Sequence, residues 1–327
     1  MRRTGATVSR GAGWVMAEAD TGESGAGQPG RGDGAALRSV LIFANPAAGG
    51  FRRRRVEAVA AGLRAIGVAC DIVVTVRAGE LAERLSGSAA LPDAVAVHGG
   101  DGSIAEAVAG LHRRAAPRPP LVVIPGGTAN VLAHEFALPA HARAIVAAVA
   151  GGARRPLYYA LANGRPFILM ASAGFDAAAV HRVSPRVKRR VGKLAYAVAA
   201  LETLRAERGC DLTIETQGGA IGARLAVVAN SSRYGGRYVI ARETAADREG
   251  LSLVVVRRDD IGGLFAVGRS LVRDAAPDPA LLSERRVGKV VIAADRPVPV
   301  QIDGDAFGFT PVEIEPVAEP LAIIAPR

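Results

Sequence analysis

Three glycine-rich segments in the first half of the chain contain residue types that can bind a phosphorylated ligand. They read NPAAGG (residues 45–50), GGDGS (residues 99–103) and PGGTAN (residues 125–130), and each follows a short apolar run. Glycine lets backbone N–H groups approach an anion because no Cβ stands in the way, and successive N–H groups can form a concave anion site. The three segments therefore indicate a site for phosphate groups.

An acidic residue, Asp101, stands among the glycines of the second segment, near the place where an anion would bind. A carboxylate is tolerated there if a metal ion, a sugar hydroxyl or backbone N–H groups engage it. Ser103 and Glu106 also have the S-x-x-E spacing of a capping box, which predicts that a helix begins here. The capping box explains the turn but gives Asp101 no role.

Familiar nucleotide-binding motifs do not account for this segment. Residues 100–105 fit the loose dinucleotide pattern G-x-G-x-x-A, but the acidic residue that should follow about 20 positions later is missing. A Walker A loop needs Gly-Lys followed by Ser or Thr, and the sequence contains no such tripeptide.

Strands and helices must bring the three segments together. An apolar run at residues 40–44 precedes the first segment, and Val56, Val59, Ala60 and Leu63 then recur at helical spacing. The same order returns at residues 93–111 and 120–139, so the three units predict a parallel sheet with crossover helices. Loops at the carboxyl ends of parallel strands share one edge of the sheet. The three segments are therefore expected to be neighbours.

The pattern changes after about residue 155. Asn163-Gly164 joins two apolar runs and predicts a hairpin, one helix is predicted within residues 184–209, and short strands with turn residues follow. These features predict a second, mostly antiparallel domain, a β-sandwich. The expected divisions are a disordered tail over residues 1–36, an α/β domain over residues 37–155 and the β-sandwich over residues 156–327, whose last strand packs within it or back on the first domain.

Composition limits the class of protein. The chain has 327 residues, is 50% hydrophobic and contains no apolar run of the ~18 residues that a membrane span needs. Its net charge of +10 would attract phosphates, nucleic acids and anionic membranes alike. Aromatic residues make up only 4% and do not alternate with the basic runs, so nucleic acid is not expected as a partner. The two cysteines, Cys70 and Cys210, lack metal-ligand spacing and favour the cytosol.

The ordered set of motifs resembles the diacylglycerol kinase catalytic-domain family, which includes sphingosine and ceramide kinases and bacterial lipid kinases. The three glycine-rich segments are followed by SAGFDAAAV (residues 172–180), GKLAY (192–196), YGG (234–236) and DGD (303–305), so the resemblance extends from about Arg38 to the C-terminus. It implies an α/β domain that binds ATP and a β-sandwich domain that binds a lipid substrate, with ATP in the cleft between them. It implies transfer of the γ-phosphate to a lipid hydroxyl, with Mg²⁺ as the metal cofactor, and diacylglycerol is the acceptor expected by default.

The resemblance also assigns roles to individual residues. The residues expected to bind ATP are Asn45, Pro46, Ala47, Ala48, Gly49, Thr75, Gly99, Gly100, Asp101, Gly102, Ser103, Glu106, Gly127 and Thr128. Asp101 would then lie beside Mg-ATP, where Mg²⁺ turns a carboxylate among phosphates into a ligand or a water-holder.

Two positions depart from the family pattern. Family members read D-G-E where this chain has Asp303-Gly304-Asp305, so the expected base, Asp305, has a shorter side chain, and Asp303 is the alternative. Bacterial relatives hold a structural Mg²⁺ in a turn, whose ligands here would be the carbonyls of Ala246 and Leu251 with the Glu249 carboxylate. Glutamate replaces the usual aspartate at that position.

The expected partners follow from the lipid substrate. The protein is expected in the cytoplasm on the inner face of the membrane, where the basic helix of residues 184–209 either contacts anionic lipid or is a solvated face. A homodimer is left open. Two other functions also remain open: a soluble kinase of the NAD kinase type, although the Asn-Glu pair that it needs is missing between Asn130 and Asn163, and a non-catalytic protein that binds nucleotide or lipid.

Overall fold

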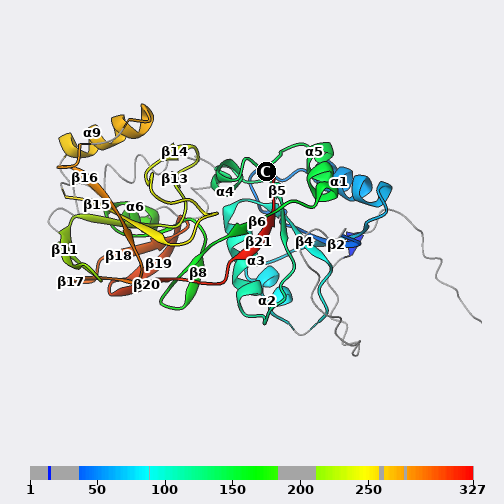
Figure 1. Cartoon of the computed structure of the whole chain (residues 1–327), viewed down its shortest axis with the longest axis horizontal. Coiled ribbons are helices and arrows are strands. Elements are labelled where there is room, and N and C mark those ends of the chain that lie inside the picture. The colour runs from blue at the N-terminus through cyan, green and yellow to red at the C-terminus, as the bar shows by residue number, and fades with distance from the viewer. Residues whose placement is uncertain are drawn as a thin grey trace, which may run out of the picture.

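The computed structural model describes residues 14–15, 37–87, 89–182, 211–257, 261–275 and 278–326. These residues form two domains that lie side by side along the longest axis of the molecule (Figure 1). Cys70 is buried and free, and burial raises the pKa of its thiol to about 11, so it is an unreactive core residue. None of the helices in the described ranges is long and apolar enough to cross a bilayer.

The first domain is built on a seven-stranded sheet in the order β1-β3-β2-β4-β5-β21-β6. The strands are β1 (Trp14–Val15), β2 (Ser39–Ala44), β3 (Ala69–Val74), β4 (Ala94–Gly99), β5 (Leu121–Pro125), β6 (Arg154–Leu157) and β21 (Leu321–Ile324). All pairs are parallel except that between β21 and β6. The helices are α1 (Arg53–Ala65), α2 (Glu80–Ser86), α3 (Asp101–His112), α4 (Val131–Glu135) and α5 (Ala142–Gly151). The predicted α/β domain with a parallel sheet is confirmed.

Helices cover both faces of this sheet, which explains why its strands read as continuous apolar runs. In β2, Val40, Ile42 and Ala44 pack with α1 and α5, whereas Phe43 joins the core on the side of α2 and α3. Successive residues of the strand thus point alternately into the two cores on opposite faces of the sheet.

The ends of the chain differ from the simplest expectation. Trp14 and Val15 pair with Ile72 and Val73 of β3, so two residues of the expected tail form a strand at the sheet edge. At the other end, β21 returns to the first domain and pairs with β5 and β6. The first-domain sheet therefore contains the end of the chain.

The second domain consists of two six-stranded antiparallel sheets. One has the order β11-β10-β17-β20-β7-β8 and the other β16-β15-β12-β9-β18-β19. The first comprises β7 (Ala160–Ala162), β8 (Arg165–Phe167), β10 (Leu212–Thr216), β11 (Gly219–Ala223), β17 (Val290–Ala294) and β20 (Val312–Pro316). The second comprises β9 (Met170–Gly174), β12 (Leu225–Ala229), β15 (Leu251–Val256), β16 (Leu282–Val287), β18 (Pro299–Ile302) and β19 (Asp305–Phe309). The short pair β13 (Arg233–Tyr234) and β14 (Tyr238–Val239) and the helices α6 (Phe175–Arg182) and α9 (Ile261–Val272) complete the domain.

The two sheets enclose one core, as a β-sandwich requires. Ile214 and Ile292 from one sheet and Val228 and Val300 from the other belong to the same buried cluster. The predicted hairpin is also present, because Asn163-Gly164 joins β7 to β8. The helix predicted within residues 184–209 lies outside the described residues.

The two domains share a second core. Leu132 and Phe136 of the first domain belong to one buried cluster with Leu169, Val227 and Val254 of the second. This continuous packing fixes the carboxyl edge of the first sheet against the second domain, and the candidate site lies there.

Candidate active site

The three glycine-rich segments meet at the carboxyl edge of the first sheet, as predicted. They follow β2, β4 and β5, which are adjacent strands. The N–H of Gly50 donates to the carbonyl of Gly126 (2.8 Å), and the N–H of Gly126 donates to the carbonyl of Gly99 (2.8 Å). Each loop is therefore hydrogen-bonded to the next.

The close approach of two loops requires glycine at two positions. A Cβ on Gly127 would stand 2.5 Å from the Cα of Gly100, and a Cβ on Gly100 would stand 3.0 Å from the Cα of Gly127. The atoms in the way belong to the backbone, which cannot move aside as a flexible side chain can. The second and third loops can therefore form one continuous backbone surface only with glycine at both positions.

Asn45 ties the first loop to the second. Its side-chain oxygen accepts the N–H of Ala47 (2.9 Å), and its amide nitrogen donates to the hydroxyl of Ser103 (3.0 Å). Ser103 is the third residue of α3, whose N-cap is Gly100 without a side-chain cap. The capping box is therefore absent, and the Ser103 hydroxyl receives the Asn45 amide instead.

The Asp101 carboxylate supports the third loop. Its two oxygens accept the N–H groups of Val131 and Leu132, each at 3.0 Å, and so cap the N-terminus of α4. Burial raises the pKa of Asp101 above its ordinary value, while these N–H groups act in the opposite direction. An acidic residue among the glycines thus has a partner even without a metal ion.

The other residues predicted to bind ATP divide into two groups. Pro46, Ala47, Gly49, Gly102 and Thr128 are exposed on the loops, and Ala48 is half-buried. Two others serve the packing of the first domain: Glu106 accepts the N–H of Leu81 in α2 (2.8 Å), and the buried Thr75 hydroxyl donates to the Ala44 carbonyl at the long distance of 3.4 Å. Their contacts do not point to a nucleotide role.

Two residues without a predicted role, His98 and Arg55, hold the loops through hydrogen bonds. His98 is fully buried, with Nδ1 2.9 Å from the Ile124 carbonyl and Nε2 3.3 Å from the N–H of Arg52, which assigns the neutral form protonated at Nδ1. Burial lowers the pKa of His98, in agreement with that form. Arg55 donates to the carbonyl of Pro125 (2.7 Å) at the start of the third loop.

The second domain contributes Asp303, in the two-residue turn between β18 and β19. Its carboxylate accepts the N–H groups of Ile168 (2.9 Å), Leu169 (2.8 Å) and Met170 (3.1 Å). Burial, reinforced by the charge of Asp101, raises the pKa of Asp303 to about 6, although the three N–H groups oppose the shift. Leu132, whose N–H Asp101 accepts, and Leu169, whose N–H Asp303 accepts, belong to one buried cluster, so both carboxylates hold backbone of the core that the two domains share.

Asp305 is the first residue of β19 and pairs with Ile302 across the turn. The turn residues Asp303 and Gly304 both have positive φ (51° and 82°), which is the geometry of a tight hairpin. Asp305 is exposed. It lies two residues from Asp303 and close to the interdomain region.

A buried network that the motifs did not reveal holds this hairpin. Gln301 accepts the N–H of Gly304 (2.7 Å) and donates to the hydroxyl of Ser172 (2.7 Å), which donates to Asp176 (2.6 Å). The hydroxyl of Tyr234 is 3.4 Å from the same Asp176 carboxylate. Burial raises the pKa of Asp176. Asp176 lies in the SAGFDAAAV motif, but only the fold shows that it connects to the turn of Asp303.

The predicted ligands of a structural Mg²⁺ lie in and next to the turn before β15. The carbonyl of Ala246 accepts the N–H of Tyr158 (2.8 Å), the Glu249 side chain is exposed, and Leu251 begins β15. Among the described residues, no group of three His, Cys, Asp or Glu side chains could hold a metal ion.

A guanidinium lies against the same turn. Arg286 donates to the carbonyl of Glu243 (3.0 Å) and to that of Glu249. A Cβ added to Gly250 would stand 2.5 Å from the Arg286 guanidinium, so this cation lies directly against the turn. The carbonyls that Arg286 contacts are not those of the predicted metal ligands, but its positive charge nearby disfavours a divalent cation. The structural Mg²⁺ site stays a prediction.

The fold and the site define a two-domain protein whose α/β domain carries three joined glycine loops suited to phosphate groups. Residues 39–161 match the model of the diacylglycerol kinase catalytic domain, and residues 170–325 match that of the YegS C-terminal NAD kinase beta sandwich-like domain. The chain belongs to the diacylglycerol kinase catalytic-domain family, a family of lipid kinases.

Individual relatives agree with this family. The chain is 26% identical over 243 residues to the diacylglycerol kinase of Bacillus subtilis strain 168, and the alignment covers 72% of this chain and 78% of the relative. It superposes on the crystal structure of a diacylglycerol kinase from Bacillus anthracis strain Sterne with a TM-score of 0.73 and 24% identity, over 89% of this chain and 98% of the other. The structural likeness supports the fold.

Proposed function

We propose that this protein transfers the γ-phosphate of ATP to the hydroxyl of a membrane lipid, most simply diacylglycerol, to give phosphatidic acid. The observation that carries the proposal is the arrangement of the site. Three hydrogen-bonded glycine loops lie at the edge of the first domain, and Asp101 of these loops and Asp303 of the acidic hairpin both hold backbone of the core that joins the two domains. Membership in a family of lipid kinases gives this arrangement its chemistry.

The loops would bind the phosphate groups through their backbone. Neither α1 nor α3 has a side-chain cap, so the N–H groups at their first turns suit an anion, and the N-terminal ends of the helix dipoles add to the attraction. Mg²⁺ that enters with ATP would neutralise phosphate charge. Asp101 and Asp303 are the acidic residues closest to it in this proposal, although their oxygens already accept backbone N–H groups.

The two aspartates of the hairpin have different roles in this proposal. Asp303 holds the turn, because its carboxylate accepts three N–H groups. Asp305 takes the proton of the lipid hydroxyl while the hydroxyl oxygen attacks the γ-phosphorus and ADP leaves. A base of this kind must come within about 2.6–3.2 Å of the hydroxyl, and the exposed position of Asp305 at the start of β19 permits that approach.

Labelled ATP and diacylglycerol-containing vesicles test the reaction directly. The label should appear in phosphatidic acid after lipid extraction. In Asp305→Ala, kcat should fall about 10²–10⁴-fold with ATP affinity unchanged by calorimetry, because only the base is lost. The control is Asp295→Ala, which removes an exposed aspartate of the same domain and should leave kcat unchanged.

Other outcomes would identify a different function. Label in NAD instead of lipid would indicate a soluble NAD kinase, and ATP binding without turnover of any acceptor would indicate a non-catalytic protein. If Asp305→Ala turns over lipid as fast as wild type, Asp305 is not the base. Asp305→Glu then shows whether the cleft is built around the shorter side chain, since a misplacement of about 1 Å can cost on the order of 10²-fold in rate.

The proposed location follows from the substrate. A kinase acting on a bilayer lipid with ATP would work in the cytoplasm at the inner face of the membrane. No nucleic acid is required in this proposal, and a homodimer is compatible with it.

A further inference from the structure

Helix α9 presents apolar side chains that are exposed in the described part of the structure. Phe265 is 73% exposed and Val272 is 70% exposed, and the two residues are seven positions apart on the same side of the helix. The opposite side carries Val267 and Leu271, which pack against the shared core. Core packing therefore fixes the helix so that Phe265 and Val272 face outward.

Basic side chains flank this apolar face. Arg269 lies between Phe265 and Val272 on the exposed side, and Arg273 follows directly after the helix. Neither arginine forms an ion pair with a carboxylate in the part of the chain that the structure describes. The helix contains no acidic residue, and the nearby Asp274 pairs with Arg242 at 2.7 Å. The exposed face of the helix itself thus combines apolar and positive groups, while the carboxylate of Asp278 lies on the segment across from it.

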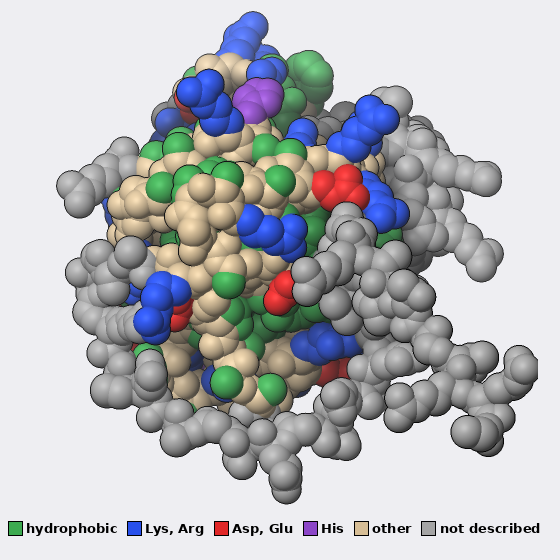
Figure 2. Space-filling model, turned by 90° about the vertical axis from the view of Figure 1, so that its right-hand side faces the viewer, with side chains coloured by type: hydrophobic (Ala, Val, Ile, Leu, Met, Phe, Trp, Pro, Cys, Tyr) green, Lys and Arg blue, Asp and Glu red, His purple; other side chains and the backbone are tan. Residues whose placement is uncertain are grey.

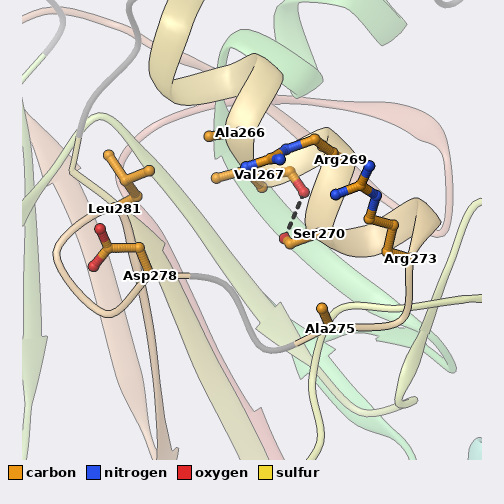
Figure 3. Close-up of a pocket in the computed structure, with 8 residues that line it drawn as sticks. All are labelled: Ala266, Val267, Arg269, Ser270, Arg273, Ala275, Asp278 and Leu281. Carbon is orange, nitrogen blue, oxygen red and sulfur yellow. Dashed lines mark hydrogen bonds between the residues drawn. The ribbon is translucent and has the colours of Figure 1, made fainter.

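The surroundings of the two arginines form a hollow of about 180 Å³ at the base of the helix. Figure 3 shows Arg269 and Arg273 on the helix, with Asp278 and Leu281 across from them on the connecting segment. The hydroxyl of Ser270 donates to the Val267 carbonyl (2.7 Å). Asp278 lines the other side of the hollow and accepts the N–H of Ala280 (2.9 Å), so the two arginines would meet lipid phosphates from the solvent side.

We propose that α9 docks on an anionic lipid bilayer, with Phe265 and Val272 inserted at the level of the headgroups and Arg269 and Arg273 bound to lipid phosphates. An interfacial helix needs this combination of exposed apolar residues and flanking basic ones. The proposal rests on the lipid kinase function and assigns its membrane contact to a defined element.

The position of α9 agrees with this role. Figure 1 shows the helix at the outer end of the second domain, away from the first domain and on the side of the β13–β14 hairpin. Tyr234 of that hairpin approaches Asp176, from which the hydrogen bonds lead to the hairpin of Asp303. The hairpin on the side of α9 is thus connected through Asp176 to the turn that carries the proposed base.

Basic residues on another described face of the surface do not flank an exposed apolar helix face in the way that those of α9 do. On the face shown in Figure 2, where the side chains are described, basic groups are spread among apolar, polar and acidic ones and do not line an exposed apolar helix. If Coulombic attraction alone decided membrane binding, every basic region of the surface would bind equally well. The exposed apolar side chains of α9 distinguish this helix from the basic groups on that face.

Vesicle binding by the full-length protein tests the proposal. The probe is a set of sedimentable vesicles of phosphatidylcholine with and without phosphatidylglycerol, in the absence of ATP. Phe265→Ser should weaken binding to the anionic vesicles about tenfold or more, because the variant lacks the phenyl ring whose transfer from water into the bilayer favours binding. Arg269→Gln should weaken it about fivefold and reduce its dependence on salt. The exposed positions of both residues predict unchanged melting temperatures.

Matched variants separate the face of α9 from general surface properties. Ile66→Ser removes another exposed apolar side chain (48% exposed), and Arg54→Gln removes another exposed arginine, both in the first domain. Neither should change vesicle binding. Equal losses in these controls, or wild-type protein that does not sediment with anionic vesicles, would overturn the proposal. A wild-type dimer that Phe265→Ser converts to a monomer would also overturn it, because the face would then be a protein interface.

Turnover of a short-chain, water-soluble lipid distinguishes this inference from the proposed kinase activity. Phe265→Ser should phosphorylate such a substrate at the wild-type rate while losing rate on vesicles. If wild type phosphorylates no lipid but binds anionic vesicles through α9, the docking surface stands and the kinase function fails. If Phe265→Ser lowers the rates on the soluble lipid and on vesicles equally and still binds vesicles, α9 affects catalysis and not membrane binding. The docking proposal then fails.

Discussion

Carboxylates at the interdomain site are bound first of all to backbone N–H groups. Asp101 caps α4 with both oxygens, and Asp303 accepts three N–H groups from the segment that leads into β9. Each aspartate thereby fixes the backbone of a neighbouring element. Their mutual repulsion contributes to the raised pKa of Asp303 and opposes keeping both groups ionised.

The shifted pKa of Asp303 predicts a specific pH dependence of stability. Its folded-state pKa, about 6, lies above the ordinary value of 3.8, so the folded protein binds this proton more tightly than the unfolded chain. The resulting stabilisation is fully present below about pH 3.8 and is lost as the pH rises through about 6. Asp303→Asn has no such titration, so the advantage of wild type over this variant should shrink between about pH 5 and pH 7.5.

Chemical denaturation of both proteins at the two pH values measures this difference. Asp303→Asn should also be less stable than wild type at about pH 5, by roughly 1–3 kcal/mol, because an NH₂ group would face N–H donors. A stability difference that grows with pH would show that the ionised form is the favoured one, and the folded-state pKa would then lie below its ordinary value.

The sequence identified most residues of the loops but not all of their contacts. Asn45, Gly100 and Gly127 lie where the motifs placed them. Spacing also suggested that Ser103 and Glu106 pair with each other, whereas Ser103 bonds to Asn45 of the first loop and Glu106 reaches α2. Those partners are distant in sequence, so local spacing could not reveal them.

Among the elements, the turn before β15 is shaped by side chains of the neighbouring strand. Arg286 on β16 donates to two carbonyls of the turn, and Thr244 closes it with a hydrogen bond to the Gly250 carbonyl (3.2 Å). Glu284, two residues before Arg286, accepts the N–H groups of the residues that enter the turn (2.8 and 2.9 Å). Strand β16 thus supplies both a positive and a negative group to the turn.

Arg286→Ala should therefore destabilise the protein, since the two carbonyls lose a charged donor. For exposed hydrogen bonds of this kind we expect a loss of about 1 kcal/mol, or a fall of about 2–4 °C in melting temperature. Arg285→Ala, which removes the neighbouring exposed arginine, is the matched control and should have little effect. Melting curves of wild type with Mg²⁺ and with a chelator should coincide. A lower melting temperature in the chelator would show that a metal ion does stabilise the fold.

Other elements were predictable to different degrees. The strand–loop–helix order predicted the parallel sheet, and Asn163-Gly164 predicted the β7–β8 hairpin, because both signals are local. The turn between β18 and β19 also carries a local signal, the Asp303-Gly304 pair. The strand at Trp14–Val15 has only its pairing with β3 to define it, so composition gave no sign of it.

At the scale of the whole molecule, the two domains are not independent. The C-terminal strand β21 pairs with β5 and β6 of the first sheet, and one buried cluster runs through both domains. The sequence left both positions open for the last strand, because an apolar run of four residues fits either sheet. Register and burial in the folded protein decide between them. This joining predicts that the domains unfold together.

The strongest polar link between the domains is Glu135, at the end of α4, and it leads to a prediction about the whole molecule. Its side chain is only 5% exposed and accepts the N–H and hydroxyl of Ser232 (3.0 and 2.7 Å) and the N–H of Ala246 (3.2 Å). In Glu135→Gln, the NH₂ group would face either the two N–H donors or the Ser232 hydroxyl beside the Arg233 guanidinium (3.6 Å from the Glu135 carboxylate), and in both orientations a charged acceptor is lost. The variant should lose roughly 1–3 kcal/mol of unfolding free energy.

Calorimetry decides whether this link acts on one domain or on both. Because the domains share a core, Glu135→Gln should lower the melting temperature in a single transition, as in wild type. Glu83→Gln, at an exposed ion pair with Arg77, is the control and should cost about 0–1 kcal/mol. Two separate transitions in the variant would mean that Glu135 alone couples the domains. In that case the lipid-side hairpin with Asp305 would no longer be held against the glycine loops, and lipid phosphorylation should fall more steeply than ATP binding.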